Sequence, residues 1–422
     1  MSNTIEGKEP NTELAVESHP ESSNAVEVSS YRPKQTFGQL LRNDLGFLPV
    51  LLTLIAIIIF FTVVSNGVFL HPENFSNLIN QIPTIGTLGL GIILVLLLGE
   101  VDLSSAAVSV LCAVVMGILS ERMGMPGWVA MLAALLTGAL VGAINGFFIA
   151  VLRIPSFIVT LASSIAYSGL LLKLLNGQST LIIRDPLIVS LAGTSKSFLP
   201  DIYGVGLPTL VVLLYIGSLF LNYTRRKKAG LRTPSIVQLT LISIAVIALV
   251  GGAVALFQSY LGVPYSTAIL FGLIILVWLM LTKTSFGRHI YATGGNNEAA
   301  RRAGINVIFI RIAVFTLAST LAAAGGILAA SHALSVQSQV DSSLQLDVIA
   351  AAVIGGVSLF GGRGSAWAIV LGMMIIGSLE NGLSLQSQTA DVKQIIEGIV
   401  LLLAVTADAV VRRLQARSRS GR

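Results

Sequence analysis

The sequence is short of charged residues and of cysteine. Only 11% of its 422 residues are Asp, Glu, Lys or Arg, whereas charged residues make up about 25% of ordinary soluble domains. The single cysteine, Cys112, stands in an apolar run, so the chain can form neither an intramolecular disulfide framework nor, by itself, a thiolate metal cluster. Together these shortages exclude a soluble globule of this size and a cysteine-based metal protein.

Motifs for catalysis and nucleotide binding are also missing. The four histidines, His19, His71, His289 and His332, are far apart, and no HExxH, nucleophile elbow or catalytic carboxylate pair occurs. The chain contains no GxxxxGKS/T loop, so it cannot cradle the phosphates of ATP by itself. We therefore predict that the protein is not an enzyme and has no catalytic residue, metal site or cofactor. Any use of ATP would belong to a separate subunit.

Apolar sequence, by contrast, is abundant. Hydrophobic residues make up 54% of the chain, and several apolar runs approach the ~20 residues that cross a ~30 Å hydrocarbon core as a helix. We predict an all-α polytopic membrane protein with about 10–12 transmembrane helices. The candidate spans are residues 46–66, 82–99, 103–119, 128–152, 156–175, 205–223, 235–257, 262–282, 307–331, 346–362, 365–382 and 392–411. Very short turns at 100–102 and 363–364 leave open whether the helices that they join are re-entrant.

The basic residues are unevenly distributed around these spans. If the N-terminus is cytoplasmic, all 26 Lys and Arg residues except Arg122, Lys173, Arg184, Lys196 and Lys393 lie on the cytoplasmic side. Because short loops rich in Lys and Arg stay inside the cell, we predict that both termini are cytoplasmic. The same placement beside apolar spans indicates charge-directed insertion and not nucleic-acid binding, despite the net charge of +6.

Three segments of different composition are predicted. Residues 1–45 form a disordered tail, acidic at first and basic next to the membrane. Residues 46–411 form the transmembrane domain, and residues 412–422 form a basic C-terminal tail. Within the domain, Gly138, Gly142 and Gly146 lie four residues apart, a stripe typical of helices that pack closely against a neighbour.

Polar residues near membrane depth are candidates for a translocation pathway. Glu100 and Asp102, in the sequence GEVDLSS, lie where the second and third predicted spans meet. Either they form a pair at the helix ends in the interface, or they belong to a pathway or gate. Ser104, Asn145 and Asp347 are further candidates for the same pathway or gate.

The predicted inside loop at 283–306 carries the most specific local pattern. Gly294 and Gly295 interrupt the chain, and Asn296 is a favourable N-cap for a short helix from Asn297 to Ala303. Gly304 then takes the position at which helices commonly end in a left-handed residue. We predict a compact, self-capped helix that projects from the membrane domain. The alternative is an ordinary connector.

The charges and small residues of this helix favour a docking element. Glu298 lies in the first turn and Arg301 and Arg302 lie in the last, so both signs complement the helix dipole. Glu298 can also pair with either arginine. A smooth face that another protein could cover is expected from Ala299, Ala300 and Ala303.

The segment Gly294–Ile305, GGNNEAARRAGI, resembles the coupling motif of ATP-binding-cassette importer permeases, in particular the ribose/xylose branch. Other segments agree with that branch across most of residues 46–411, namely Val101–Ser104, Arg153–Leu161, Leu346–Ala351 and Val353–Ser365. The basic segment near 224–234, with the helix pair that it joins, resembles the longer xylose-type permeases. The chain departs from the family at Ser105-Ala106-Ala107, where a valine and a glycine are common, and at Asn297, where proline is common.

This resemblance implies the permease subunit of a monosaccharide importer in the bacterial plasma membrane, with a xylose-like pentose as the favoured substrate. It implies a permease homodimer in the lipid bilayer, cytoplasmic ATPase subunits and an extracellular or periplasmic sugar-binding protein, without nucleic acid. The ATPase would contact the loop residues Gly294, Gly295, Asn296, Glu298, Ala299, Ala300, Arg301 and Gly304. The alternative from another class is a stand-alone, ion-coupled secondary sugar carrier.

Overall fold

The computed structural model describes residues 48–194, 197–231, 233–389, 391–396, 398–399, 402 and 406. By its internal contacts the chain divides into two units, Met1–Leu45 and Gly46–Arg422, and the description below concerns the second. The predicted tails at 1–45 and 412–422, with most of the last predicted span at 392–411, lie outside the described residues.

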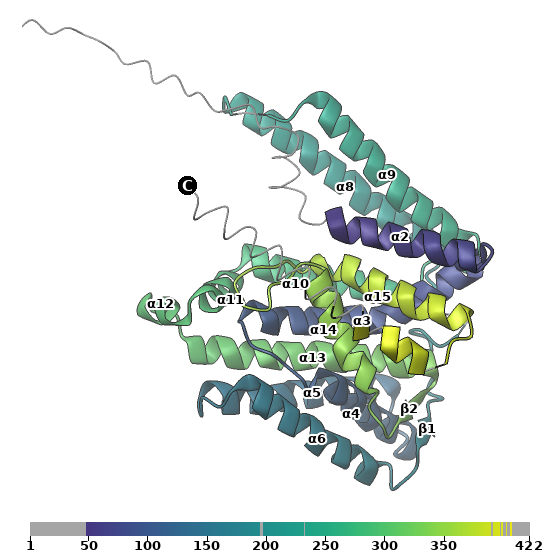
Figure 1. Cartoon of the computed structure of the whole chain (residues 1–422), viewed down its shortest axis with the longest axis vertical. Helices are drawn as coiled ribbons and strands as arrows, with labels where there is room; N and C mark the ends of the chain where they lie inside the picture. Colours follow the sequence, from purple (N-terminus) through teal and green to yellow (C-terminus); the bar gives the residue numbers. More distant parts are fainter. Residues whose placement is uncertain are drawn as a thin grey trace, which may run out of the picture. The chain divides into compact units, whose positions relative to one another are not determined.

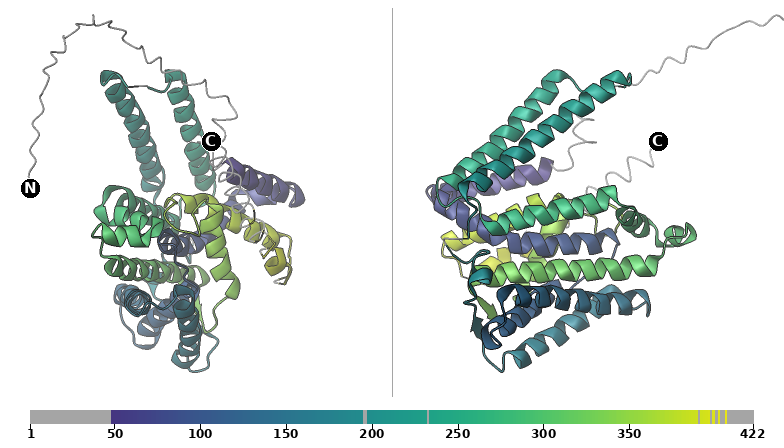
Figure 2. Two further views of the ribbon diagram at one scale, coloured as in Figure 1. Left: turned by 60° about the vertical axis from the view of Figure 1, so that its left-hand side comes forward. Right: turned by 180° about the vertical axis from the view of Figure 1, so that it is seen from behind.

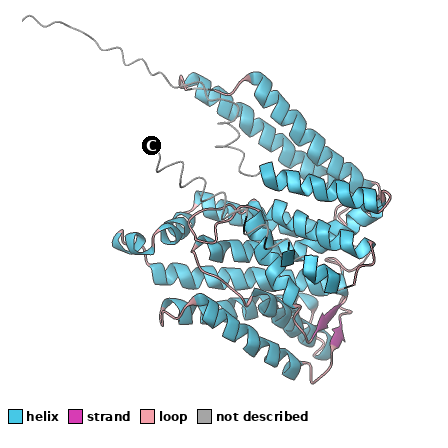
Figure 3. Ribbon diagram, viewed as in Figure 1, coloured by secondary structure: helices cyan, strands magenta, loops and turns pink. Residues whose placement is uncertain are grey.

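Helices make up most of the described chain, and its two strands are short (Figures 1 and 3). The helices are α2 (Leu48–Val64), α3 (Pro72–Leu97), α4 (Ser105–Gly117), α5 (Gly127–Ala150), α6 (Ser156–Leu174), α7 (Pro186–Val189), α8 (Asp201–Lys228), α9 (Ile236–Gln258), α10 (Tyr265–Lys283), α11 (Ser285–Gly295), α12 (Asn297–Arg302), α13 (Val307–Ala333), α14 (Ser342–Ile354) and α15 (Ala368–Leu385). A 3-10 turn (Val68–Leu70) precedes α3, and a π turn (Ile118–Arg122) extends α4. The strands β1 (Thr180–Ile182) and β2 (Ser335–Gln337) are antiparallel, with Leu181 opposite Val336.

Nine helices in the described part of the chain are long and apolar enough to cross a membrane, which confirms the predicted all-α polytopic membrane protein. They are α3, α4 with its π turn, α5, α6, α8, α9, α10, α13 and α15. Shorter apolar stretches occur in α2, at Val50–Val64, and in α14, at Ser343–Ile354.

Some of the predicted boundaries are wrong. The predicted span at 346–362 extends too far, because α14 ends at Ile354 and is followed by Gly355 and Gly356, the second of which has a φ of 100°. The predicted span at 82–99 begins too late, since Pro72 starts α3 and Pro83 lies inside it. The predicted loop at 283–306 contains two helices, of which the sequence predicts only the second.

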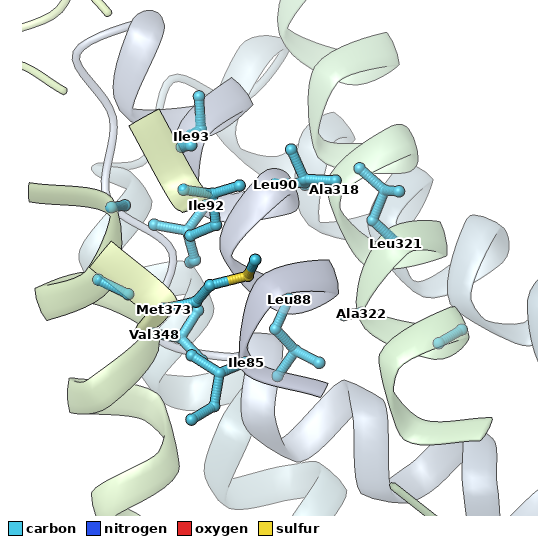
Figure 4. Packing of buried hydrophobic residues seen from close by; sticks show 14 of the residues in the cluster. Ile85, Leu88, Leu90, Ile92, Ile93, Ala318, Leu321, Ala322, Val348 and Met373 are labelled. Atoms are coloured by element: carbon cyan, nitrogen blue, oxygen red, sulfur yellow. The ribbon is translucent and has the colours of Figure 1, made fainter. Parts of the chain in front are cut away.

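The centre of the domain is α3, whose residues from Ile82 to Leu97 are apolar on all sides except for Thr84 and Thr87, as expected for a helix buried in an interior. Of its most apolar stretch, 83% is buried. Figure 4 shows Leu88, Leu90 and Ile93 of α3 among side chains of α13, α14 and α15, and all three are fully buried. The helix α3, from the first half of the chain, is therefore held in place by helices from the second half.

The glycine stripe of α5 packs against α13. A Cβ on Gly138 would meet the carbonyl oxygen of Ser319, and a Cβ on Gly142 would overlap that of Phe315. Gly146 approaches the backbone of α13 in the same way, one turn further on. The predicted close packing of this stripe is confirmed, and α13 is the partner that it accommodates.

The helices α8 and α9 form an antiparallel pair that stands away from the helices around α3 (Figures 1 and 2). Only 6% and 11% of their most apolar stretches are buried within the protein. Because these stretches are apolar on every side, their exposed surface suits contact with lipid chains. The pair ends in the basic run Arg225–Lys228.

Candidate functional site

The short helix α12 lies at the end of the helix bundle opposite to the strands β1 and β2 (Figure 1). Asn296 precedes it in an extended conformation, with a φ of −162°, and its Oδ1 accepts a hydrogen bond of 2.9 Å from the N–H of Ala299. This bond satisfies one of the N–H groups that a helix start leaves free. The predicted N-cap is confirmed.

The other end of α12 is closed by Gly304. Its φ is 84°, and its N–H donates to the carbonyl of Arg301 at 3.0 Å. The N–H of Ile305 donates to the carbonyl of Ala300 at 3.1 Å. These two bonds form the Schellman motif, in which a left-handed residue ends the helix. The predicted left-handed glycine is confirmed.

The surface of α12 is charged and exposed. Glu298 Oε1 lies 3.3 Å from Arg301 Nη2 and 3.3 Å from Arg302 Nε, so the predicted pairing occurs with both arginines. Such exposed pairs contribute only a few tenths of a kcal/mol. The predicted smooth alanine face is wrong at Ala300, because Ala300 is 4% exposed and faces the protein. The other two alanines, Ala299 and Ala303, are exposed.

The helices α12 and α13 follow each other almost without a linker. Asn306 caps α13, and its Oδ1 accepts a hydrogen bond of 3.0 Å from the N–H of Phe309. Only residues 303–306 separate the two helices. Because both flanking helix ends are capped, this connection has little conformational freedom.

A glycine junction, formed by Leu97, Gly294, Gly361 and Gly362, joins this region to the bundle. The N–H of Gly362 donates to the carbonyl of Leu97 at 2.9 Å, and a Cβ on Gly294 would overlap that same carbonyl oxygen. Gly361 and Gly362 have φ values of 82° and 69°, a conformation that glycine adopts without steric cost. Backbones from the ends of α11 and α3 and from the loop before α15 thus meet in direct contact.

Tyr291 adds a side-chain contact to the junction. Its hydroxyl donates a hydrogen bond of 2.8 Å to the carbonyl of Gly364, in the loop before α15. Burial raises the pKa of the Tyr291 phenol, so the group keeps its proton and remains a donor. The segment Val353–Ser365, which the sequence singles out only by resemblance, therefore serves to attach α11 to α3.

A second group of polar residues begins at Asp102, which is 2% exposed. Its Oδ1 accepts hydrogen bonds of 2.7 Å from both the N–H and the hydroxyl of Ser104, and its Oδ2 accepts one of 2.7 Å from the hydroxyl of Ser105. Asp102 therefore supports the start of α4. Glu100 has a different partner, Arg311 of α13, with 2.9 Å between Oε1 and Nη2. Glu100 and Asp102, which the sequence suggests as one pair, therefore have different partners and belong to two sites.

The hydrogen bonds around Asp102 and Ser104 continue from α4 to α5 and α6. Asn145 Nδ2 donates to Ser104 Oγ at 3.3 Å. Asn145 Oδ1 accepts from the hydroxyl of Ser163 at 2.8 Å and from that of Tyr167 at 3.3 Å. We use the name polar cluster for Asp102, Ser104, Asn145, Ser163 and Tyr167. The structure thus brings together the candidates Asp102, Ser104 and Asn145. The sequence does not single out Ser163 and Tyr167, because α6 carries several hydroxyl residues and nothing local shows which of them face Asn145.

The helix α14 contributes Gln345 to the same place. Gln345 Nε2 donates to the carbonyl of Asp102 at 3.0 Å, and its Oε1 accepts from the N–H of Ala106 at 2.9 Å. The candidate Asp347 is also buried on α14, at 8% exposure, but residues two positions apart do not share a helix face. Gln345 of α14, which the sequence does not single out, thus binds the start of α4.

The starts of α4 and α14 share an Asp-x-Ser contact, although Asp341 is the N-cap of α14 and Asp102 lies two residues before Ser104, the N-cap of α4. Asp341 Oδ1 accepts hydrogen bonds of 2.9 Å from the N–H and the hydroxyl of Ser343, as Asp102 does from Ser104. The helix α14 has 13 residues, which is short for a membrane crossing, whereas α4 reaches 18 residues with its π turn. Two helix starts with an Asp-x-Ser contact thus lie beside the polar cluster. The hydroxyl and amide groups of the cluster can donate to and accept from a polyhydroxylated solute.

The chain is similar to transport permeases of known sequence. Residues 74–405 match the family described as the permease component of the branched-chain amino acid transport system. The xylose transport system permease protein XylH of Escherichia coli K12 is 34% identical over 392 residues, which cover 93% of this chain and 99% of that protein. The ribose import permease protein RbsC of Bacillus subtilis is 30% identical over 83% of this chain and 89% of its own length.

A third relative is named for a hexose, fructose. The fructose import permease protein FrcC of Rhizobium meliloti is 28% identical over 93% of this chain and 94% of its own length. No solved structure matches the chain. The three relatives are therefore permeases that are named for different sugars.

Proposed function

Because this chain belongs to the family of branched-chain-type transport permeases, we propose that it is the membrane subunit of an ATP-binding-cassette importer for a monosaccharide. The relatives that cover most of the chain are sugar permeases by name. The protein is a multi-pass membrane protein, and the membrane is the bacterial plasma membrane. The family is a transport component, so the permease performs no bond chemistry of its own.

The observation that carries this proposal is the structure of α12. It is capped at both ends, by Asn296 and by Gly304, and its charged side chains are exposed. The residues just before α12 belong to the glycine junction, where backbone atoms of three segments are in contact. A short, rigid and exposed helix at one end of a membrane bundle is suited to dock into a partner and to pass on its movement. The partner in this proposal is an ATPase subunit.

The α12 end of the bundle would face the cytoplasm. Arg225–Lys228 at the end of α8, Lys283 at the end of α10 and both arginines of α12 are basic, and short basic loops are retained inside the cell. A sugar-binding protein would then deliver the sugar at the opposite end, where β1 and β2 lie. A second copy of the permease would complete the pathway as a homodimer.

The substrate in this proposal is a xylose-like pentose. The xylose permease of Escherichia coli matches 93% of this chain, which includes the region of the α8–α9 pair. The polar cluster supplies hydroxyl, amide and carboxylate groups next to the starts of α4 and α14, and these groups match the hydrogen-bonding groups of a sugar. ATP-driven closure of the ATPase dimer would shift α12, and the bundle would change between outward and inward access.

A stand-alone, ion-coupled carrier is less well supported. Such a carrier depends on an ionisable group within the membrane that is available to the coupling ion. In this structure Glu100 is paired with Arg311, and the carboxylate of Asp102 accepts three hydrogen bonds at the start of α4. Both carboxylates are therefore occupied by contacts within the protein.

Reconstitution tests the proposed function directly. The permease is placed in vesicles, and the ATPase and the sugar-binding protein are added singly and together, with radiolabelled xylose, ribose and fructose as probes. We expect uptake only when both partners and ATP are present, and we expect xylose to be taken up fastest. Uptake by the permease alone, driven by a proton or sodium gradient, would contradict the importer and support the carrier. Faster uptake of ribose or fructose would correct the substrate alone.

A further inference from the structure

We propose that the ion pair between Glu100 and Arg311 is the contact through which a movement of α12 reaches the polar cluster. This inference rests on the proposed function, because the pair has this role only if α12 docks to an ATPase. In this scheme Glu100 and Arg311 are positioning residues, and neither of them needs to touch the sugar or the ATPase.

Arg311 is placed to move with α12. Gly304 ends α12, Asn306 begins α13 directly afterwards, and each of these ends is held by hydrogen bonds. Arg311 follows about one turn after the Asn306 cap, on the same continuous helix. Because the connection between the two helices is so short, a displacement of α12 also displaces the first turns of α13.

Glu100, the other member of the ion pair, lies on the loop that carries Asp102. This loop is fastened to the start of α6, since the N–H of Val101 donates to Ser156 Oγ at 3.2 Å and that of Leu103 donates to Thr160 Oγ1 at 3.0 Å. It is also fastened to α14, because Gln345 binds the carbonyl of Asp102. A force on Glu100 therefore acts on the starts of α4, α6 and α14 together.

The ion pair is partly shielded from solvent, and the guanidinium of Arg311 does not use all of its N–H groups. The side chains of Arg311 and Glu100 are 21% and 15% exposed, so their attraction is screened less than that of a surface pair. Nη2 of Arg311 makes the contact, whereas its Nε is buried and has no hydrogen-bond partner. A guanidinium can bind a carboxylate through two N–H groups. A second, two-point geometry is thus available when α13 shifts against the loop.

Neighbouring contacts are less suited to this task. The glycine junction holds α11 against α3 through backbone atoms, which offer no side chain that can change partners. The pairs of Glu298 with Arg301 and Arg302 lie within α12 itself and are exposed. They stabilise the docking helix but connect it to nothing else. The pair of Glu100 and Arg311 joins α13 to the loop of the polar cluster.

The test uses the complete importer, with permease, ATPase and sugar-binding protein in the same vesicles. Sugar uptake and ATP hydrolysis are measured together, and the sugar transported per ATP is compared. Glu100→Gln and Arg311→Gln should each lower this ratio about tenfold, a common size for coupling between distant sites, while ATP hydrolysis continues. The exchanged pair, Glu100→Arg with Arg311→Glu, should recover part of the ratio. Arg311→Lys, which keeps the charge but lacks the two-point fork, should give an intermediate ratio.

A matched control is Arg122→Gln. Arg122 also ties helix ends together, since its guanidinium donates to the carbonyls of Leu174 and Leu175 and to the side chain of Gln178. It lies at the end of the bundle away from α12, so its loss should leave the ratio at the parental value. A general loss of rigidity would lower the ratio in the control as well and would contradict a specific role for the pair.

The other outcomes are equally decisive. An unchanged ratio in both Gln variants would overturn the proposal, and so would equal losses of uptake and hydrolysis. If the Gln variants fail to assemble, Arg311→Lys decides, because an intermediate ratio supports the proposal and a parental ratio overturns it. The parental complex is measured first. Absence of ATP-dependent uptake in the parent would refute the proposed function, and this inference would fall with it, whereas an active parent with insensitive variants refutes the inference alone.

Discussion

The backbone N–H of Gly362 donates a hydrogen bond of 2.9 Å to the carbonyl oxygen of Leu97. Gly294 approaches the same carbonyl so closely that no Cβ could be accommodated there. Three segments from distant parts of the chain therefore meet at the last residue of α3. Side chains at Gly294 or Gly362 would push these backbones apart, which explains why glycines gather at this place.

Gly294→Ala should separate α11 from α3. The added Cβ would overlap a backbone carbonyl that cannot turn aside, so we expect a loss of stability of about 1–3 kcal/mol, as for other overpacked sites. A lower melting temperature of the purified permease, together with reduced ATP-driven uptake, checks this expectation. Gly295→Ala is the control, because a Cβ on Gly295 meets no atom within 4 Å. Equal behaviour of the two variants would argue against the junction.

Substitutions of Gly304 should follow its left-handed conformation and not helix propensity. A residue with a side chain at the observed φ of 84° loses roughly 1–2 kcal/mol, least for asparagine and most for a β-branched residue. We expect ATP-driven transport to fall in the order Gly304, Gly304→Asn, Gly304→Ala, Gly304→Val, at nearly constant expression. A Cβ at this position meets no atom within 4 Å, so crowding does not disturb the series. An alanine variant as active as the parent would contradict the prediction.

Glu298→Lys should uncouple the permease without unfolding it. The reversal removes the contacts to Arg301 and Arg302 and a helix-dipole contribution of roughly 0.3–1 kcal/mol, which is too little to unfold a large bundle. Membrane insertion should stay normal, while co-purification of the ATPase and sugar uptake both decrease. Glu73→Lys reverses a charge in the first turn of α3 and serves as the control that should change neither. Parental uptake in Glu298→Lys would refute docking through α12.

Asn145→Leu should impair transport more than stability alone explains. The leucine is close in size but leaves the hydroxyls of Ser104, Ser163 and Tyr167 without their amide partner, at a cost of about 1–3 kcal/mol. Asn381→Leu is a matched control, because Asn381 is also buried and exchanges amide hydrogen bonds with Asn74. Both variants should lower the melting temperature, and only Asn145→Leu should raise the sugar concentration for half-maximal uptake. A similar shift in the control would contradict the assignment of the cluster to the pathway.

The sidedness of the membrane domain can be tested with introduced cysteines. Arg226→Cys, at the exposed end of α8, should react with a membrane-impermeant thiol reagent only after the cells are opened. Arg184→Cys should react from outside intact cells. The native Cys112 is buried, so it contributes little background. Labelling of Arg226→Cys in intact cells would contradict the proposed orientation.

Local features of the docking helix were predictable because their causes lie within a few residues of each other. The Asn296 cap, the charges of Glu298 and the arginines, and the left-handed Gly304 all act over three to five positions in the chain. Hydropathy predicted the membrane class for a similar reason, since the length of each apolar run is a local property. The end of α14 was misjudged, because an apolar run continues past two glycines that stop the helix.

The tertiary structure alone decided which distant groups meet. Nothing in the sequence shows that Gly294 and Gly362 both lie against the carbonyl oxygen of Leu97. Glu100 pairs with Arg311 only because α3 ends beside the start of α13. The polar cluster likewise needs α5 and α6 side by side before Asn145 can bind Ser163. Apolar periodicity determines that a helix is buried but not which helix lies beside it, because many pairings bury similar apolar area. The choice among them comes from close packing, as where the glycines of α5 admit the backbone of α13.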